Sequence, residues 1–128
     1  MIKKILIVDD SIVARTCTKK ALPKDASYEL YEAFDGLSGL EQFKTVAPDV
    51  TFLDLTMPVM SGFEALDEIK KIDKNAVVIV VTADIQKKTI DRVLEAGALL
   101  VISKPPSHEE ISGALEKARK FIEGVMKK

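Results

Sequence analysis

Residues that form covalent or metal cross-links are almost absent from this sequence, whose 128 residues include one cysteine, one histidine and no tryptophan. Cys17 has no partner for an internal disulfide, and one cysteine with one histidine cannot assemble an ordinary zinc site. The same count leaves His108 as the only histidine available to a Ser-His-Asp triad. No serine or cysteine nucleophile is placed to use it. Because His108 lies in the first turn of the expected last helix, we expect its side chain to be solvated.

An excess of one charge is also missing, because 19 Lys and Arg residues face 20 Asp and Glu residues and the formal net charge is −1. Without a basic stripe, nucleic-acid binding is not expected. The longest apolar run, 76–81, has six residues and cannot span a bilayer. The N-terminal apolar run stops at Asp9-Asp10, too early for a signal peptide. We therefore expect a cytoplasmic protein without membrane insertion.

Length and composition indicate one domain. At about 150 residues per domain, a chain of 128 residues predicts a single domain over 1–128. A hydrophobic content of 47% and a charged content of 30% are typical of an ordinary globular protein. The sequence shows no linker, repeat or low-complexity tract, and we expect a monomer.

Short β-branched runs alternate with helical patterns five times along the chain. The expected strands are 5–8, 28–33, 50–53, 77–81 and 99–102. Several are apolar at successive positions, which is typical of strands covered by helices on both faces. Short connections and right-handed crossovers then predict an α/β fold, with a doubly wound, five-stranded parallel sheet and five helices.

Local signals mark the helices more closely. Ser107 and Glu110 form a capping-box pattern at the start of the last helix. Apolar residues at helical spacing define the buried faces. The stripe of the first helix includes Cys17, that of the second runs to Ala47, and that of the fourth includes Leu94. We expect these three residues to face the core.

Polar residues end four of the five expected strands. They are Asp9, Asp10, Asp54, Thr82 and Lys104. Ligands of a parallel α/β sheet bind beyond the carboxyl ends of its strands, near the point where the strand order reverses. Three carboxylates that meet there repel one another and need a cation, and an all-oxygen ligand set favours Mg²⁺ or Mn²⁺ over zinc.

This set of groups suits chemistry on a phosphoryl group. A carboxylate can attack phosphorus as the nucleophile, while a metal ion and a lysine neutralise charge on the phosphoryl oxygens. The sequence has neither a Gly-x-x-x-x-Gly-Lys loop nor a Gly-x-Gly-x-x-Gly loop, so nucleotide binding by those routes is not supported.

Four segments carry a resemblance to a known family: 9–11, 54–62, 82–83 and 104–105. The second reads Asp-Leu-Thr-Met-Pro-Val-Met-Ser-Gly. In their order and spacing they resemble the receiver domain of bacterial two-component response regulators, and most of all stand-alone CheY-like receivers of chemotaxis. The resemblance covers the whole chain and implies the strand order 2-1-3-4-5. It implies a phosphoprotein of phosphorelay signal transduction and not an enzyme.

The resemblance assigns a role to each site residue. Asp54 would be the phosphoacceptor, phosphorylated by a histidine kinase. Mg²⁺ would bind the side chains of Asp10 and Asp54 and the backbone carbonyl of Thr56, with Asp9 coordinating mostly through water. Mn²⁺ is the other candidate ion.

Two further residues would contact the phosphoryl group. Lys104 would pair with it, and Thr82 would donate a hydroxyl hydrogen bond. The resemblance also implies a cis peptide bond between Lys104 and Pro105. The partners it implies are the kinase and a downstream protein target or phosphatase.

Some of these residues also have a purely structural interpretation. Asp9 and Asp10 could begin the first helix, since Asp is a favoured N-cap, and Asp54 could cap the helix that follows it. Asp84, two residues after Thr82, could reach the mouth of the site or cap the fourth helix. The sequence leaves both roles of Asp84 open.

One position departs from the family pattern. CheY-like receivers usually carry Tyr or Phe three residues before the lysine, where this chain has Val101. Valine has no ring to move between buried and exposed positions. We therefore expect the change that follows phosphorylation to centre on Thr82 and the start of the fourth helix.

Three other functions remain as alternatives. A phosphorelay intermediate would pass its phosphoryl group to a histidine phosphotransfer protein. A flavodoxin-like FMN carrier would need a Ser/Thr/Gly-rich loop after the first strand, which the sequence 10–13 does not provide. A haloacid-dehalogenase-type phosphatase would need Asp-x-Asp there, whereas here the two aspartates are adjacent.

Overall fold

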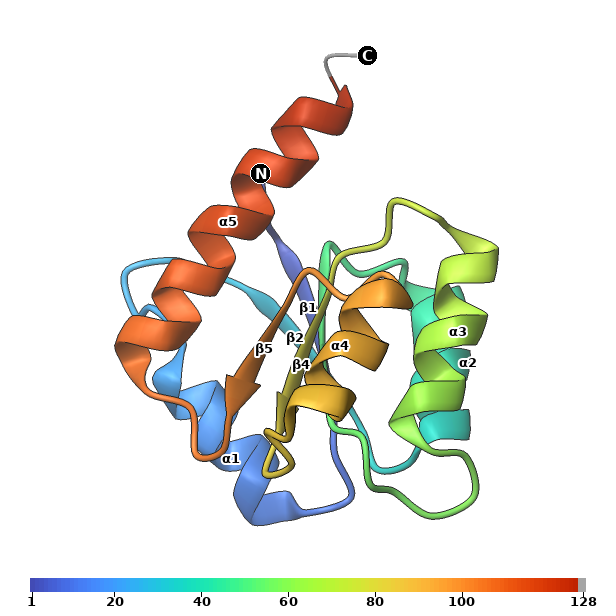
Figure 1. The fold of residues 1–128 in the computed structure, drawn as a ribbon. Coiled ribbons are helices and arrows are strands. Elements are labelled where there is room, and N and C mark those ends of the chain that lie inside the picture. The colour runs from blue at the N-terminus through green and yellow to red at the C-terminus, as the bar shows by residue number, and fades with distance from the viewer. Residues whose placement is uncertain (127–128) are drawn as a thin grey trace.

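A parallel sheet forms the centre of the computed structural model, which describes residues 1–126 (Figure 1). Its strands are β1 (Lys4–Val8), β2 (Glu29–Ala33), β3 (Val50–Leu53), β4 (Val78–Thr82) and β5 (Leu100–Ser103). Its helices are α1 (Ile12–Ala21), α2 (Gly36–Val46), α3 (Gly62–Ile72), α4 (Lys87–Glu95) and α5 (His108–Met126). The strand order is β2-β1-β3-β4-β5, which confirms the fold class and the implied order.

Helices cover both faces of this sheet, which explains the continuous apolar runs in the strands (Figure 1). Ile5 and Ile7 of β1 pack in one core cluster with residues of α1 and α5. Leu6 and Val8 point to the opposite face and pack in a second cluster with residues of α2, α3 and α4. Successive side chains of a strand alternate between faces, so a strand with two covered faces is apolar at every position.

The strand ends agree with the sequence prediction to within one residue. The third strand matches 50–53, and the first begins one residue early, at Lys4. The fourth and fifth strands lie one residue later than expected. Thr82 is therefore the last residue of β4 and is hydrogen-bonded into the sheet opposite Ser103 of β5.

The predicted capping box is present at the start of α5. The backbone N–H of Glu110 donates to Ser107 Oγ, and the N–H of Ser107 donates to Glu110 Oε1, both at 3.0 Å. His108 is exposed, as predicted, and its ring also makes two polar contacts. Its Nδ1 lies 3.0 Å from the carbonyl oxygen of Ala21, and its Nε2 lies 3.4 Å from Ser112 Oγ. The imidazole thus joins the end of α1 to the start of α5.

Three stripe residues are less buried than predicted. α2 ends at Val46, since the residue before a proline is disfavoured in the helical conformation. Ala47 is its C-cap, has a left-handed backbone conformation with φ of 51°, and is exposed. Leu94 is 43% exposed. α4 lies near the edge of the sheet, and the sheet covers only a narrow face of this helix. Cys17 is half-buried.

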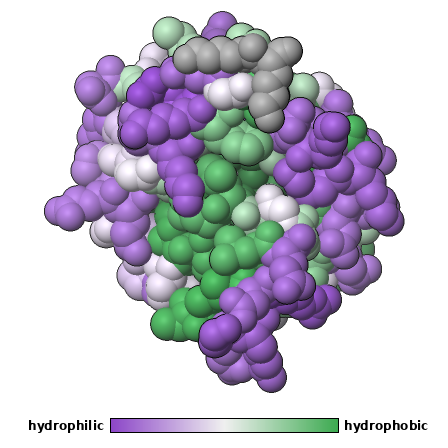
Figure 2. Space-filling view, turned by 45° about the horizontal axis from the view of Figure 1, so that its top comes forward, coloured by the Kyte–Doolittle hydropathy of each residue, from purple (hydrophilic) through white to green (hydrophobic). Residues whose placement is uncertain are grey.

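The surface beside β5 is more apolar than its surroundings. β5 is an edge strand, and its Leu100 and Val101 are half-buried. Figure 2 shows an apolar strip on this face, flanked by hydrophilic residues. None of the helices in residues 1–126 is both long enough and apolar enough to cross a membrane.

Candidate functional site

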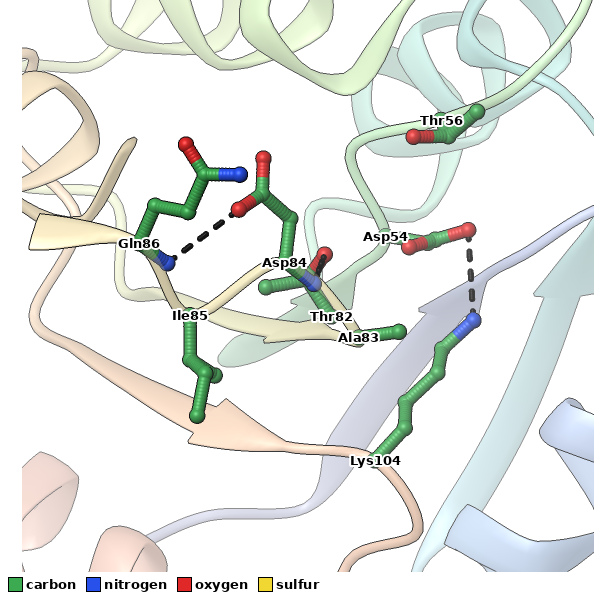
Figure 3. A pocket seen from close by; sticks show the side chains of 8 residues that line it. All are labelled: Asp54, Thr56, Thr82, Ala83, Asp84, Ile85, Gln86 and Lys104. Carbon is green, nitrogen blue, oxygen red and sulfur yellow. Dashed lines mark hydrogen bonds and ion pairs between the residues drawn. The ribbon is translucent and has the colours of Figure 1, made fainter. Parts of the chain in front are cut away.

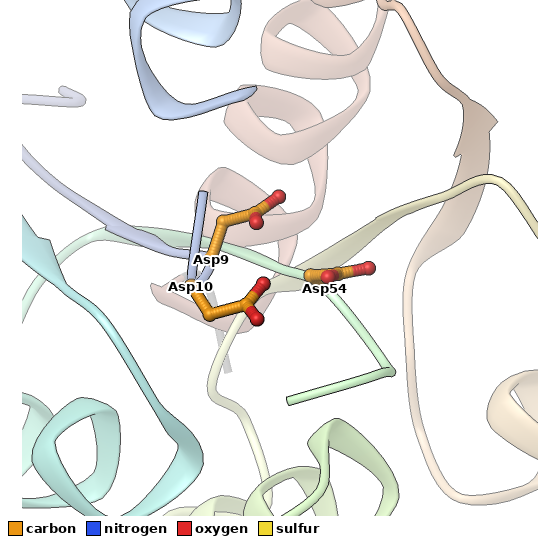
Figure 4. A group of neighbouring side chains, drawn as sticks. All are labelled: Asp9, Asp10 and Asp54. Carbon is orange, nitrogen blue, oxygen red and sulfur yellow. The ribbon is translucent and has the colours of Figure 1, made fainter. Parts of the chain in front are cut away.

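Three carboxylates meet at the carboxyl end of the sheet. Asp9 and Asp10 directly follow β1, Asp54 directly follows β3, and these two strands are neighbours. One oxygen from each carboxylate lies within 4.8 Å of the others (Figure 4). Asp9 and Asp54 are buried, and Asp10 is exposed. The parallel pairing of β1 with β3 therefore brings together groups that lie far apart in the sequence.

A lysine that directly follows β5 completes this group. Lys104 Nζ lies 2.6 Å from Asp9 Oδ2 and 3.3 Å from Asp54 Oδ2. Its backbone N–H donates to the carbonyl of Thr82 at 3.0 Å, which ties the loop after β5 to β4. The peptide bond to Pro105 is cis, as the resemblance implied.

Burial and neighbouring charges together shift two pKa values at the site. Burial away from water, followed by repulsion from Asp9, raises the pKa of Asp54 above its ordinary value, although the ammonium of Lys104 opposes this. Burial alone would lower the pKa of Lys104, but its hydrogen bond to Asp9 and the charge of Asp54 outweigh that effect and raise it. The lysine stays protonated, while ionised Asp54 lacks enough compensating positive charge.

The short loops hold these groups in place through local contacts that the sequence analysis did not identify. The N–H of Ser11 donates to Asp9 Oδ1 at 3.0 Å, and Arg15 Nη1 donates to the carbonyl oxygen of Asp9 at 2.6 Å. The sequence signal for this contact was the position of Arg15, a basic residue one turn into the first helix and therefore close to the aspartates before it. On the other side, a Cβ added to Gly62 would lie 1.9 Å from the carbonyl oxygen of Asp54, so the loop from β3 to α3 approaches Asp54 as closely as only glycine allows.

The alternative capping roles of the aspartates are wrong. Ser11 is the N-cap of α1 and accepts the N–H of Ala14 at 3.2 Å. Ser61 is the N-cap of α3 and accepts the N–H of Glu64 at 3.2 Å. Asp54 and the aspartates that follow β1 therefore do not act as the N-caps of α1 and α3.

An open cleft of about 560 Å³ extends from Asp54 towards α4 (Figure 3). Its lining residues are Asp54, Thr56, Thr82, Ala83, Asp84, Ile85, Gln86 and Lys104. Figure 3 shows Asp84 and Gln86 on one side, with Asp54 and Lys104 on the other. Thr82 is 2% exposed, and its Oγ1 accepts the N–H of Asp84 at 3.1 Å.

Of the two roles considered for Asp84, the position at the cleft is observed, whereas the N-cap of α4 is Gln86 and not Asp84. The residue lines the cleft, and its carboxylate also accepts the N–H of Gln86 at 3.2 Å and the hydroxyl of Thr89 at 2.9 Å. Thr89 is not among the site residues predicted from the sequence. A threonine among the lysines at the start of α4 was the only available signal. Thr56 lines the cleft, and the role of its carbonyl as a metal ligand stays a prediction.

The carboxylate cluster fits a divalent cation. The clustered donors are oxygen atoms, as Mg²⁺ prefers. Burial, and after it repulsion from Asp9, raises the pKa of Asp54, and a cation beside the ionised carboxylate would offset both effects. Asp10 offers an exposed oxygen through which an ion could enter the cluster. Such a cation would neutralise charge on a phosphoryl group.

The fold and this acidic pocket define a receiver domain. A family model described as "Response regulator receiver domain" matches residues 5–116, and the chain belongs to this family.

Relatives indicate which receivers it is similar to. It is 40% identical to the chemotaxis protein CheY of Thermotoga maritima over 119 residues, 92% of this chain and 98% of that protein. It is 37% identical to sporulation initiation phosphotransferase F of Bacillus subtilis over 117 residues, 91% of this chain and 94% of that protein. A chain in the crystal structure of the CheX–CheY–BeF3–Mg complex from Borrelia burgdorferi superposes with a TM-score of 0.85 at 28% identity, covering 91% of this chain and 89% of that chain.

Proposed function

We propose that this receiver domain accepts a phosphoryl group on Asp54 from a histidine kinase, in a Mg²⁺-dependent reaction, and signals through phosphorylation-dependent protein binding. The observation that carries the proposal is the position of the Asp54 carboxylate. It is buried at the mouth of an open cleft, 3.3 Å from an ammonium group and next to two more carboxylates. The receiver is a signalling domain that promotes its own phosphorylation and dephosphorylation.

The proposed transfer is a substitution at phosphorus. An Asp54 oxygen forms the new P–O bond, the P–N bond to the kinase histidine breaks, and its electron pair stays on the leaving imidazole. The product is an acyl phosphate. Lys104 would leave its ion pair with Asp9 in part and donate a hydrogen bond to a phosphoryl oxygen, and the hydroxyl of Thr82 would donate a hydrogen bond to another. Bound Mg²⁺, held by Asp10, Asp54 and the carbonyl of Thr56, would supply positive charge.

Chemotaxis is the proposed setting. The similarity to CheY of Thermotoga maritima extends over nearly the whole of both chains. The CheY-containing complex from Borrelia burgdorferi also contains CheX, and a partner of that kind is one candidate for the downstream protein here. The phosphorelay alternative is less favoured, and membership of the receiver family argues against the FMN carrier and the dehalogenase-type phosphatase. We also propose that 1–128 forms one domain that acts as a cytoplasmic monomer.

The test is labelling with acetyl phosphate and Mg²⁺, followed by intact mass measurement. The wild-type chain should gain one phosphoryl group, and Asp54→Asn, which keeps the shape but removes the nucleophile, should gain none. Asp67→Asn, a change at an exposed carboxylate of α3, is the matched control and should label as the wild type does. Labelling of Asp54→Asn at the wild-type rate would place the acceptor elsewhere.

A further inference from the structure

The start of α4 is poorly stabilised by its own sequence. Its N-cap, Gln86, makes no side-chain hydrogen bond to the helix, and the first turn contains Lys87 and Lys88 but no acidic residue. Positive side chains are unfavourable at a helix N-terminus, where backbone N–H groups carry partial positive charge. Only two of the nine residues of α4, Thr89 and Val93, are buried. Interactions from outside the helix must therefore hold its first turn.

Asp84 provides those interactions. Its Oδ1 accepts the N–H of Gln86 at 3.2 Å, and its Oδ2 accepts the hydroxyl of Thr89 at 2.9 Å. Its negative charge also compensates the positive helix end. Because Thr89 is 6% exposed, its hydroxyl would lose a hydrogen bond that little water could replace if Asp84 moved away.

The same residue is bonded to the phosphorylation site. The N–H of Asp84 donates to Thr82 Oγ1 at 3.1 Å. A hydroxyl group has one proton to donate and two lone pairs, so this bond leaves the proton of Thr82 available to an acceptor in the cleft. Thr82 and Asp84 line the cleft together with Asp54 (Figure 3). A continuous chain of hydrogen bonds thus runs from Thr82 through Asp84 to Thr89.

On the neighbouring strand β5, position 101 has no polar side chain that could make a comparable link. Val101 is aliphatic and half-buried, and it pairs in register with Val80 of β4. Displacement of the first turn of α4 would in contrast alter an exposed surface, because Lys87 and Lys88 of that turn are exposed and Ile85, just before it, is 55% exposed.

We propose that Asp84 and Thr89 are positioning residues that orient the hydroxyl of Thr82 and couple it to the first turn of α4. When Thr82 turns towards a phosphoryl group on Asp54, Asp84 moves with it, and its bonds to Gln86 and Thr89 change. The reorientation of Thr82 is thus transmitted to the backbone of the first turn of α4. This inference rests on the proposed function, since it assumes that the phosphoryl group forms on Asp54.

Hydrogen exchange of the full chain, with and without beryllofluoride and Mg²⁺, tests the coupling. In the wild type, beryllofluoride should change amide protection across 87–95. Thr89→Val keeps the side-chain shape and removes the hydroxyl, so it should reduce that ligand-induced change by about fivefold, the effect of one lost hydrogen bond. Thr89→Ser restores the hydroxyl and should restore the change. Thr45→Val, which removes a hydroxyl bonded to the carbonyl of Glu41 on α2, should leave it intact.

The outcomes separate this inference from the proposed function. Failure of wild-type labelling by acetyl phosphate would overturn the proposed function, and with it this inference. Normal labelling combined with an equal response of 87–95 in the wild type and Thr89→Val would overturn the coupling alone. If Thr89→Val loses helix α4 before ligand is added, Asp84→Ala becomes the test variant. If beryllofluoride changes the protection of 87–95 in Asp84→Ala as much as in the wild type, the coupling is overturned in the same way.

Discussion

The ionisation of Asp54 opposes folding of the metal-free chain. Burial and the neighbouring Asp9 raise its pKa in the folded state above the ordinary value of 3.8. Between that value and the raised one, the folded state binds more protons than the unfolded state, so stability falls as the pH rises. The stabilising effect of the protonated group is fully present below 3.8 and is lost above the folded-state pKa.

Asp54→Asn should therefore raise the free energy of unfolding at neutral pH in metal-free buffer. The gain should shrink as the pH falls towards the ordinary aspartate value, because the wild-type carboxyl becomes neutral as well. Urea denaturation at both pH values, with Asp67→Asn as the control, measures this. A gain that stays constant with pH would mean that charge at Asp54 is not the cause.

Backbone strain at Val59 gives a second prediction at the scale of single residues. Val59 is 77% exposed and has φ of 68°, a left-handed conformation that a β-branched side chain rarely adopts. Val59→Asn should raise the free energy of unfolding by about 1 kcal/mol, because asparagine tolerates this conformation. Val13→Asn, at an exposed valine in α1, should change it by less than about 0.5 kcal/mol. Equal effects in thermal or urea denaturation would show that the strain at Val59 is not the cause.

At the scale of the secondary-structure elements, the connection from β3 to α3 depends on close packing around Gly62. A methyl group at Gly62 would collide with the backbone of Asp54, whereas a methyl group at Gly113 of α5 would meet no atom within 4 Å. Gly62→Ala should lower the free energy of unfolding by about 1–3 kcal/mol and slow the labelling of Asp54. Gly113→Ala should raise it by about 0.5–1 kcal/mol and leave labelling unchanged.

Urea denaturation and the acetyl phosphate assay measure the two effects together. If Gly62→Ala labels at the wild-type rate, the contact between Gly62 and the backbone of Asp54 does not position the carboxylate.

Elements with local signals could be predicted from the sequence, and those that depend on distant contacts could not. The capping box of Ser107 and Glu110 and the strand 50–53 rest on residues close together in the chain. The exposure of Leu94 depends on how little of α4 the sheet covers, which no periodicity encodes. The strand-end carboxylates were predictable because parallel strands direct their carboxyl ends to one edge. The role of Thr89 depends on where the loop before α4 folds.

At the scale of the whole molecule, metal binding should be linked to folding. A cation that binds the folded carboxylate cluster and not the unfolded chain stabilises the protein by mass action, by about 1.4 kcal/mol when its concentration is about ten times the dissociation constant. Asp10→Ala removes an exposed ligand and should abolish both this stabilisation and Mg²⁺-dependent labelling. Thermal denaturation with and without Mg²⁺, and with Mn²⁺ as a second ion, measures the effect. Equal stabilisation of the wild type and Asp10→Ala would place the ion outside the cluster.

The site is assembled from the ends of β1, β3, β4 and β5, with whole helices between them in the chain. No single segment carries enough of it to bind or react alone. A molecule with one strand out of register would therefore lose the acceptor geometry and remain unmodified. Damaged copies of the proposed regulator would be silent, so errors in folding would weaken the signal and would not generate a false one.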